Sequence, residues 1–378
     1  MDLTRTAYGT WNGGRFMNYG EPLDDDRFIA CLRLAYDRGI RTFLTADVYG
    51  SGQADELVGR AFEGTSRDSY CLVGAVGHDF YTGQRAGSKG FPRFTDPTLR
   101  KPRDFGDYLR MATEKSLARC RVDRFDLLLL HNPDFAGYTS DQVWKGMERL
   151  REAGLTARLG IAPGPANGFT LDIIQCFERY RGLIDWAMVI LNPFEPWPGS
   201  LCLSAAAQTG VQVLTRVVDY GGLFHDDVKP GHAFLPRDHR AFRPAGWVEA
   251  GCEKIERLRP VADAHGLTLL QFACAWTLQQ PAVRCVLPTL IQEAGGGTKS
   301  IEAKIGELAA LPDEVMLSED ELALVREVGD NRNCMSLKGG NPEYTGETVA
   351  DQWALDADLQ AVASRWGVQP ERDLVKTH

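Results

Sequence analysis

Long hydrophobic runs are missing from this chain of 378 residues. No apolar run approaches the roughly 18–20 residues that a membrane-spanning helix needs, so we expect no such helix. The first residues, MDLTRTAYGTW, also lack the basic and then apolar layout of a signal peptide. Lys and Arg form no stripe with interleaved aromatic residues, and the net charge is −9, which argues against a nucleic-acid partner. These absences favour a cytoplasmic enzyme that acts on a small molecule.

Closely spaced cysteine pairs are missing as well. The nine cysteines are scattered without a Cys-x-x-Cys pair, and several of them, such as Cys71 and Cys285, lie inside apolar runs. This spacing supports neither a zinc ribbon nor a disulfide framework. We therefore expect reduced and mostly buried thiols.

The chain does contain a regular alternation of apolar, strand-like runs with amphipathic, helix-like runs. The predicted strands are 6–10, 42–46, 70–76, 125–130, 157–162, 186–192, 212–218 and 284–290. Helical runs between them include 25–38, 106–119, 140–151, 170–180 and 269–279. Nearly continuous apolar strands indicate a parallel sheet that is covered on both faces. Eight strand–helix units predict an α/β fold of the (β/α)8 TIM-barrel type rather than an open sheet.

Three insertions and a C-terminal extension interrupt this rhythm. The insertions are 78–103, 219–247 and the shorter 291–298. Loops longer than about 12–15 residues, such as the first two, are usually functional lids or disordered. They follow predicted strands, so we expect them on the catalytic face of the barrel. We predict a barrel over 1–311 and a helical extension over 312–378 packed on it. The extension has helices near 318–328 and 354–366 and a turn-rich segment around 338–346.

Two strand ends carry candidate catalytic residues. The stretch 39–59, GIRTFLTADVYGSGQADELVG, ends an apolar strand and continues with Asp47 and Tyr49. The stretch RVDRFDLLLLHNPD places His131 after four leucines, again at a strand end. In a barrel of parallel strands, these ends meet on the catalytic face.

Both stretches resemble the aldo-keto reductase superfamily, and the resemblance covers about residues 5–310. It implies an NAD(P)-dependent oxidoreductase. In that reading Tyr49 transfers the proton, His131 orients the substrate oxygen and Asp47 supports Tyr49. A tyrosine with its ordinary pKa of about 10 is a poor acid near pH 7, so the phenol has to be polarised.

The family's catalytic lysine is replaced here, because Ala75 occupies its position in LVGAVGHDF. Without that cation Asp47 loses its partner, and Tyr49 loses the charge that would lower its pKa. A redox role then needs another cation from strand seven or its loop, for which the candidates are Arg216, Lys229 and Arg237.

The cofactor side also departs from the family pattern. After Gly160, the family's Gly-x-Ser-Asn is replaced by a sequence with Ala162 and Pro163, and Met188 stands where the family has a glutamine. These are the residues that hold the nicotinamide amide in the family. The resemblance still implies a set of cofactor-binding residues, namely Arg216, Gly222, Thr298, Ser300 and Lys304.

The spacing around HNPDF and GIAPGPAN most resembles the sugar-oxidising branch of the family, which implies a polyhydroxylated substrate. The substrate-binding candidates are Trp11, His78, Asn192 and His225. Asp47, His78 and His131 are residue types that bind metals, but no compact ligand run accompanies them. We therefore expect no metal.

Three functions stay open at this point. The first is an NAD(P)-dependent oxidoreductase of a sugar or another small hydroxy-carbonyl compound, which the family resemblance favours. The second is a redox-neutral lyase, isomerase or epimerase of a keto sugar, with nicotinamide binding lost. The missing lysine and amide contacts favour it. The third is a reductase-like binding protein without catalysis.

Overall fold

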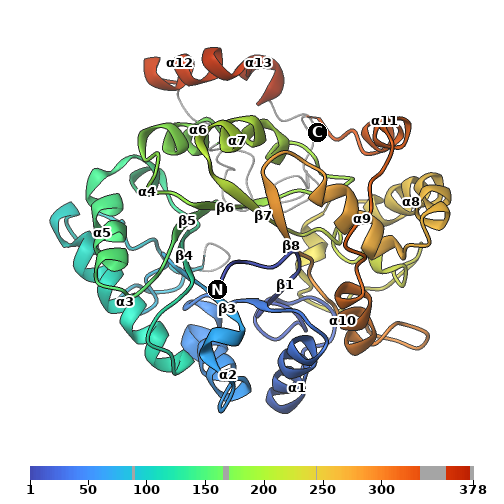
Figure 1. Ribbon diagram of the computed structural model, residues 1–378, viewed down its shortest axis with the longest axis horizontal. Coiled ribbons are helices and arrows are strands. Elements are labelled where there is room, and N and C mark those ends of the chain that lie inside the picture. Colours follow the sequence, from blue (N-terminus) through green and yellow to red (C-terminus); the bar gives the residue numbers. More distant parts are fainter. Residues whose placement is uncertain (87–89, 165–169, 244, 333–354, 375–378) are drawn as a thin grey trace.

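The computed structural model of the protein describes residues 1–86, 90–164, 170–243, 245–332 and 355–374. These residues form an eight-stranded sheet in which each strand pairs in parallel with the next one along the chain. A parallel bridge between Thr6 and Val286 brings the last strand back to the first. Figure 1 shows the resulting barrel with its outer ring of helices. The predicted (β/α)8 architecture is confirmed.

All eight predicted strands are present, and nearly all of their residues are buried. Their bounds are β1 Ala7–Gly9, β2 Thr42–Leu44, β3 Cys71–Val76, β4 Leu127–His131, β5 Leu159–Ala162, β6 Trp186–Ile190, β7 Gln212–Arg216 and β8 Val283–Leu287. Several end earlier than predicted, because the apolar run continues into the loop at the barrel mouth.

The described helices follow the strands in the expected order, and the loops add short 3-10 turns. The α-helices are α1 Asp25–Asp37, α2 Gln53–Ala61, α3 Phe105–Cys120, α4 Phe135–Thr139, α5 Asp141–Glu152, α6 Thr170–Arg179, α7 Leu203–Thr209, α8 Trp247–Ala264, α9 Leu269–Leu278, α10 Ile301–Ala309, α11 Glu319–Val328, α12 Ala357–Trp366 and α13 Pro370–Asp373. The 3-10 helices are η1 Tyr49–Gly52, η2 Arg67–Ser69, η4 Pro102–Asp104, η5 Gly199–Cys202, η6 Leu223–His225 and η7 His239–Phe242. Their starts follow local chemistry: Thr268 and Gln271, for example, form a capping box at α9.

Alternate residues of the strands face two separate cores, because side chains in a strand point to opposite faces in turn. In β3, Cys71, Val73 and Ala75 belong to a small cluster inside the barrel. Leu72 and Val76 belong to the larger cluster between strands and helices. The inward-facing residues nearest the strand ends can therefore border the barrel mouth, and Ala75 is one of them.

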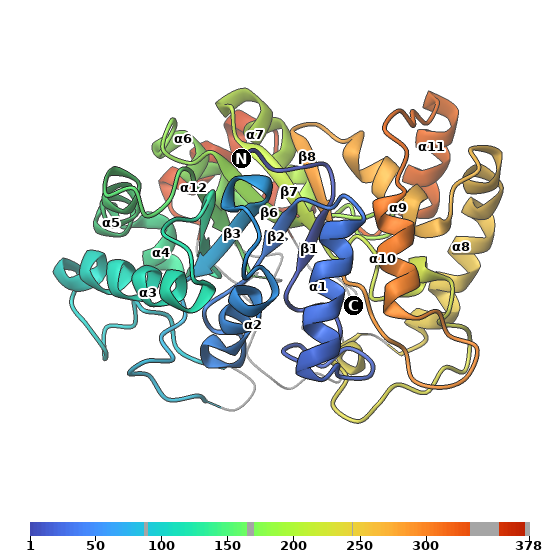
Figure 2. The ribbon, with the colours of Figure 1, turned by 60° about the horizontal axis from the view of Figure 1, so that its bottom comes forward.

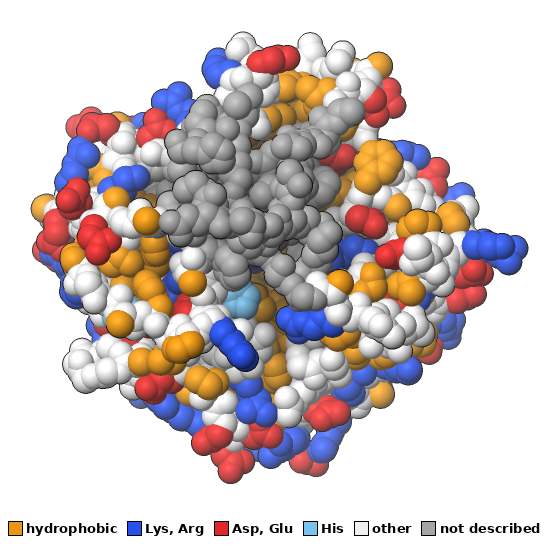
Figure 3. Space-filling view, turned by 180° about the vertical axis from the view of Figure 1, so that it is seen from behind, with side chains coloured by type: hydrophobic (Ala, Val, Ile, Leu, Met, Phe, Trp, Pro, Cys, Tyr) orange, Lys and Arg blue, Asp and Glu red, His pale blue; other side chains and the backbone are white. Residues whose placement is uncertain are grey.

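The long insertions lie at the end of the barrel where the strands finish, as predicted. Figure 2 shows the loops of 78–103 and 219–247 together at this end, below the barrel. Figure 3 views the same end from outside, and a pale-blue histidine is visible beside a hollow there. The insertions thus surround the face on which the candidate residues are expected.

The described part of the C-terminal extension packs on the outside of the barrel (Figure 1). Glu178 of α6 receives hydrogen bonds from Arg365 and from Nε1 of Trp366, both in α12. Asn331 exchanges two hydrogen bonds of 3.0 Å with the backbone of Trp197. The predicted turn around 338–346 lies outside the described residues.

The structure also bears on the cysteines and on the length and apolar character of the helices. The eight cysteines among them are free thiols, and seven are buried. In the part of the chain that the structure describes, no helix combines the length and the apolar character needed to cross a membrane.

Candidate active site

The turn after β2 places Tyr49 at the barrel mouth. The chain passes through Gly50, Ser51 and Gly52, whose φ angles of 59°, 54° and 99° are all left-handed. A Cβ at Gly52 would lie 2.6 Å from Nε of Arg119, so this position depends on glycine. Tyr49 itself is half-buried. The glycines of the sequence motif therefore set the direction in which the tyrosine leaves the strand.

His131 ends β4 and lies next to Tyr49. Their ring centroids are 5.9 Å apart and the rings are nearly perpendicular. His131 is buried, and its Nδ1 has no hydrogen-bond partner among the described residues. Burial is the main reason why the pKa of His131 lies well below its ordinary value, and nearby positively charged side chains lower this pKa further. The imidazole is therefore neutral at pH 7, and one of its nitrogens can donate a hydrogen bond while the other accepts.

His78 joins this pair from the insertion after β3. Its ring centroid lies 5.0 Å from that of His131. Arg93 donates to Nδ1 of His78 at 2.9 Å, and the side-chain amide of Asn132 lies 3.1 Å from Nε2. Burial and the charge of Arg93 lower the pKa of His78 to about 3. The mouth thus contains two adjacent neutral histidines.

Arg93 and Asn132 are site residues that the sequence analysis missed. Arg93 also donates from Nε to the backbone oxygen of Asn132, which has a left-handed φ of 46°. Asn132 could have been identified as a site residue from the sequence, because it directly follows His131. Nothing in the loop sequence marked Arg93 among its neighbouring basic residues, because only the folded loop brings it to His78.

Asp47 lies beneath the mouth, completely buried, and neither carboxylate oxygen has a hydrogen-bond partner among the described residues. Its backbone N–H donates to the oxygen of Ala75 at 3.2 Å, so the two positions are adjacent, as the sequence alignment implied. The nearby cation, Arg119, forms its ion pair of 3.1 Å with Asp55 instead. Burial and the charge of Asp55 raise the pKa of Asp47 well above its ordinary value.

Arg216 is the half-buried cation among the three candidates from strand seven and its loop. It ends β7, and its Nη2 donates to the backbone oxygen of Pro163, beyond the end of β5, at 3.1 Å. The side chain therefore extends along the mouth past β6. Burial raises the pKa of Tyr49 to about 12, and Arg216 is the group that opposes this rise. The other two candidate cations, Lys229 and Arg237, are exposed to solvent.

The substrate-binding candidates divide into two groups. Trp11 packs edge-on against Tyr49, with centroids 6.3 Å apart, and His78 lies beside His131. Asn192 and His225, in contrast, are completely buried. The Asn192 side-chain nitrogen donates to Glu195 and to the backbone oxygen of Val217 beyond β7, and its side-chain oxygen accepts from Glu195 N. Nε2 of His225 lies 2.8 Å from the oxygen of Thr289. The expectation that these two contact substrate is corrected, because the fold uses both side chains to hold loops.

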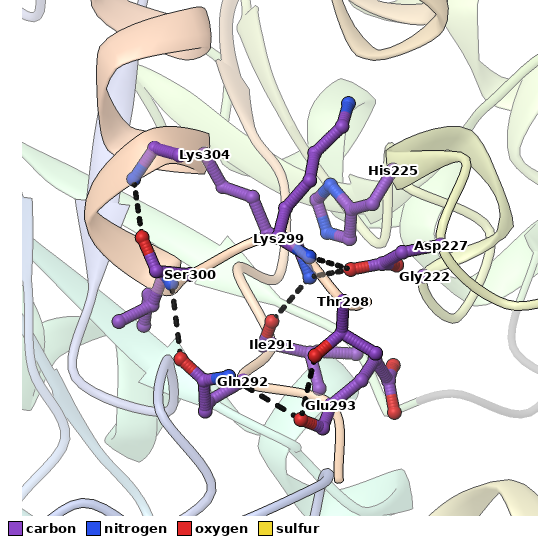
Figure 4. A network of polar contacts seen from close by, with 12 residues as sticks. Gly222, His225, Asp227, Ile291, Gln292, Glu293, Thr298, Lys299, Ser300 and Lys304 are labelled. Atoms are coloured by element: carbon purple, nitrogen blue, oxygen red, sulfur yellow. Dashed lines mark hydrogen bonds and ion pairs between the residues drawn. The ribbon is translucent and has the colours of Figure 1, made fainter. Parts of the chain in front are cut away.

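The cofactor candidates lie mainly between the β7 loop and α10, shown in Figure 4. Thr298 and Ser300 are accessible, and Ser300 caps α10 by accepting from Ala303 N. Lys304 is completely buried, with Nζ 2.7 Å from Asp227 and 2.5 Å from the oxygen of Ile291. Its expected role in phosphate binding is corrected, because this ammonium is already paired and has no exposed surface.

Gly222 is also enclosed. Its N–H donates to the carboxylate of Asp219 at 2.8 Å, and a Cβ there would lie 3.1 Å from Oε1 of Glu293. Arg240 pairs with that Glu293 and with Asp238 at 2.7 Å, and all three side chains are about 1% exposed. The glycine therefore allows close packing of a buried ionic network, and its contact with the cofactor stays a prediction.

Within the described residues, no group of three or more His, Cys, Asp and Glu side chains is arranged to hold a metal ion.

Comparison with known proteins agrees with the barrel fold. The chain is 25% identical over 325 residues to D-threo-aldose 1-dehydrogenase of Pseudomonas sp, covering 82% of this chain and 91% of that protein. The glycerol dehydrogenase AKR11B4 from Gluconobacter oxydans superimposes with a TM-score of 0.67 at 23% identity, over 87% of this chain and 92% of the other.

An aldo/keto reductase from Klebsiella pneumoniae, solved in complex with NADP and acetate, has a TM-score of 0.58 at 21% identity, over 92% and 95% of the two chains. The family model described as Aldo/keto reductase family matches residues 6–316. Members of this family are usually oxidoreductases that use NAD(P). The chain belongs to the aldo/keto reductase family.

Proposed function

We propose that the protein is an NAD(P)-dependent oxidoreductase that interconverts a carbonyl and an alcohol on a small polyhydroxylated molecule. The observation that carries the proposal is the contact between Tyr49 and the neutral His131 at the ends of β2 and β4. In reduction, the phenol of Tyr49 donates a proton to the substrate oxygen. In oxidation, the phenolate takes the proton back.

His131 orients the substrate oxygen. A neutral imidazole can donate one N–H to an oxygen that becomes negative, and burial makes that hydrogen bond stronger than it would be in water. Asp47 has a smaller part than the sequence resemblance implies. Its carboxyl has no hydrogen-bond partner among the described residues and is favoured in its neutral form, so it shapes the floor beneath Tyr49.

The accessible residues fit a dinucleotide cofactor in part. Arg216, at the end of β7, has a buried Nε without a hydrogen-bond partner in the described part of the chain. Thr298 and Ser300 are accessible at the start of α10, and helix N-termini favour phosphate. We propose that these three residues hold the cofactor and that Gly222 and Lys304 support the loops around it. Bound NAD(P) would supply or accept the hydride.

A hydroxylated substrate agrees with the other groups at the mouth. His78, Arg93 and Asn132 form a connected set of polar groups beside His131, and Trp11 forms an apolar wall beside Tyr49. One relative is, by its name, an aldose dehydrogenase. An aldose or a similar sugar is therefore the first substrate class to test.

The test is a titration of the purified protein with NADPH and NADH, followed by calorimetry, and then a screen of aldoses with the nucleotide that binds. We expect dissociation constants in about the micromolar range, as for ordinary enzyme ligands. Tyr49→Phe should lower kcat by about 10²–10⁴-fold. Tyr180→Phe is the matched control, because its hydroxyl bonds to Asp141 on the outer helices. Absence of nucleotide binding up to millimolar concentration would overturn the proposal.

A redox-neutral isomerase of a keto sugar is the second candidate. Three apolar residues favour it, namely Ala75, Ala162 and Met188, which are buried in the cluster inside the barrel. At these positions the family has the lysine and the groups that bind the nicotinamide amide. Proton abstraction next to a carbonyl needs only a base, an acid and an oxyanion donor. Exchange of a keto sugar's α-proton with deuterated solvent, without nucleotide and dependent on Tyr49, would favour this candidate.

A further inference from the structure

We propose that Arg93 and His78 hold the side-chain amide of Asn132 with its oxygen toward His78 and its NH2 group toward the barrel mouth. There the NH2 group donates a hydrogen bond to a hydroxyl oxygen of the substrate. The inference rests on the proposed function, since it concerns how a polyhydroxylated substrate is recognised. Asn132 directly follows His131 and is half-buried, so a donor at this position lies beside the residue that orients the reacting oxygen.

The backbone of the insertion after β3 places Arg93 beside His78. The two residues form an antiparallel bridge, and the N–H of Phe94 donates to the oxygen of Gly77 at 3.0 Å. The hydroxyl of Tyr108, in α3, donates to the backbone oxygen of His78 at 2.8 Å. The contact between the Arg93 and His78 side chains is therefore held in place by the backbone on both sides of it.

The contacts of His78 decide which of its ring nitrogens carries the proton. Nη1 of Arg93 lies 2.9 Å from Nδ1, and a guanidinium has only donors, so Nδ1 accepts and carries no proton. The backbone oxygen of Phe91 lies farther from Nδ1, at 3.3 Å, and it can accept from Arg93 instead, at 3.4 Å. The shorter, charge-assisted hydrogen bond is the stronger of the two. Since a neutral imidazole carries one proton, His78 carries it on Nε2.

This proton fixes the orientation of the Asn132 amide. Nδ2 of Asn132 lies 3.1 Å from Nε2 of His78. Two N–H donors that face each other at this distance are unfavourable, while half a turn of the amide puts Oδ1 at nearly the same place as an acceptor. His78 is then a positioning residue, because its one N–H is bonded to Asn132 and not to the substrate.

The turned amide directs its NH2 group toward open space beyond the end of β5. A Cβ at Gly164 would lie 3.9 Å from Oδ1 of Asn132, which is the position that the NH2 group takes after the half turn. Apart from its chain neighbours, this Cβ would meet no other atom within 4 Å in the described part of the chain. The backbone of Asn132 is fixed on both sides, since its N–H donates to the oxygen of Ala162 at 2.7 Å and its oxygen accepts from Nε of Arg93. The NH2 group is thus a donor in a fixed position with room for a ligand oxygen.

The first test identifies the protonated nitrogen of His78 by two-bond ¹H–¹⁵N correlation NMR of protein labelled with ¹⁵N-histidine, and His78→Gln assigns the signals. At pH 7 we expect the proton on Nε2 in wild type and in Arg93→Lys, which keeps a cation that can only donate. In Arg93→Leu we expect the proton to move to Nδ1, because the oxygen of Phe91 then remains as its acceptor. Arg103→Leu is the matched control, because Arg103 is an exposed arginine of the same insertion. A proton on Nδ1 in wild type, or an unchanged tautomer in Arg93→Leu, would overturn the inference.

The second test asks whether Asn132 recognises a hydroxyl group. The value of kcat/KM is compared for the best aldose and for its deoxy analogues, each of which lacks one hydroxyl. We expect wild type to discriminate against one analogue by at least about tenfold, as for the loss of one hydrogen bond, and Asn132→Leu to lose this discrimination. A residue with only a structural role would lower kcat/KM for all of these sugars alike. The same preference among the analogues in both proteins would overturn recognition by Asn132.

The inference and the proposed function can fail separately, because the NMR measurement needs neither cofactor nor substrate. A protein that binds no nucleotide but carries the His78 proton on Nε2 would contradict the oxidoreductase proposal alone. A protein that binds nucleotide and reduces aldoses, with the His78 proton on Nδ1, would contradict this inference alone. Folding of each variant is checked by circular dichroism, and wild type with Arg93→Lys keeps the test usable if Arg93→Leu does not fold.

Discussion

Two groups of buried residues at the barrel mouth differ in whether their titratable side chains are paired. On the β2–β4 side, Asp47 has no hydrogen-bond partner for its carboxylate among the described residues, and His78 and His131 are held neutral. On the β7–β8 side, Lys304 pairs with Asp227, and Arg240 pairs with two carboxylates, all of them almost without exposed surface.

This difference separates side chains that can take part in a reaction from side chains that hold the loops in place. A buried ion pair fixes two segments, because removing either partner leaves an uncompensated charge. The pairs on the β7–β8 side hold the loop of 219–247 against the segment before α10. Unpaired neutral groups can change protonation or accept a new partner, which is what a proton-transfer site requires. The β2–β4 side is therefore the side on which we expect the reaction.

The largest effect on the free energy of unfolding is expected when one partner of the buried ion pairs on the β7–β8 side is removed. Arg240→Met leaves Asp238 and Glu293 buried without their cation and should lower the free energy of unfolding by about 3–5 kcal/mol, measured by urea denaturation. Arg259→Met is the control, because Arg259 also lies between two carboxylates, Asp226 and Glu256, but its side chain is 29% exposed. That change should cost at most about 1 kcal/mol. Equal effects of the two changes would contradict the comparison.

A second prediction concerns a buried carboxylate in the first turn of α6, Asp172. Its Oδ2 has no hydrogen-bond partner in the described chain, and burial, with a contribution from Asp356, raises its pKa from 3.8 to about 6. Its stabilising contribution is complete below pH 3.8 and is lost as the pH rises through 6. The loss is at most about 3 kcal/mol, at 1.36 kcal/mol for each pH unit.

Asp172→Asn should remove this loss, so the variant should be more stable than wild type above pH 6 and similar to it at pH 4. Urea denaturation at pH 4, 5, 6 and 7 measures the difference. A difference in stability between the two proteins that stays constant across this pH range would contradict the raised pKa of Asp172.

The smallest effect is expected at Asp47. Its pKa is raised, so the stability it contributes is lost as the pH rises through that pKa. Asp47→Asn should raise the free energy of unfolding at pH 7 by about 1–2 kcal/mol, because it removes a carboxylate that has no partner. Asp55→Asn should instead lower it, since Asp55 accepts from Thr45 and Ser116 and pairs with Arg119. Thermal unfolding shows whether each variant is more or less stable than wild type. A lower stability of Asp47→Asn would contradict the comparison.

The fold was predictable because its signals are local and repeated. Apolar strands alternating with amphipathic helices fix the eight-unit barrel, and the strand ends then fix one face for Tyr49 and His131. The loops were less predictable. Asn192 and His225 have residue types that suit a binding site, but their bonds to Glu195 and to Thr289 depend on loop paths that no local pattern encodes.

The sequence by itself determined the barrel, the position of Tyr49 and His131 at strand ends, and the absence of a lysine at Ala75, because strand order and period place those residues directly. Only the tertiary structure decided which of the candidate cations is withdrawn from solvent. Arg216, Lys229 and Arg237 were equal candidates from the sequence, but Arg216 alone of these three is half-buried, while the other two face solvent. Electrostatic energy depends on distance and burial, and both exist only once the loops have folded.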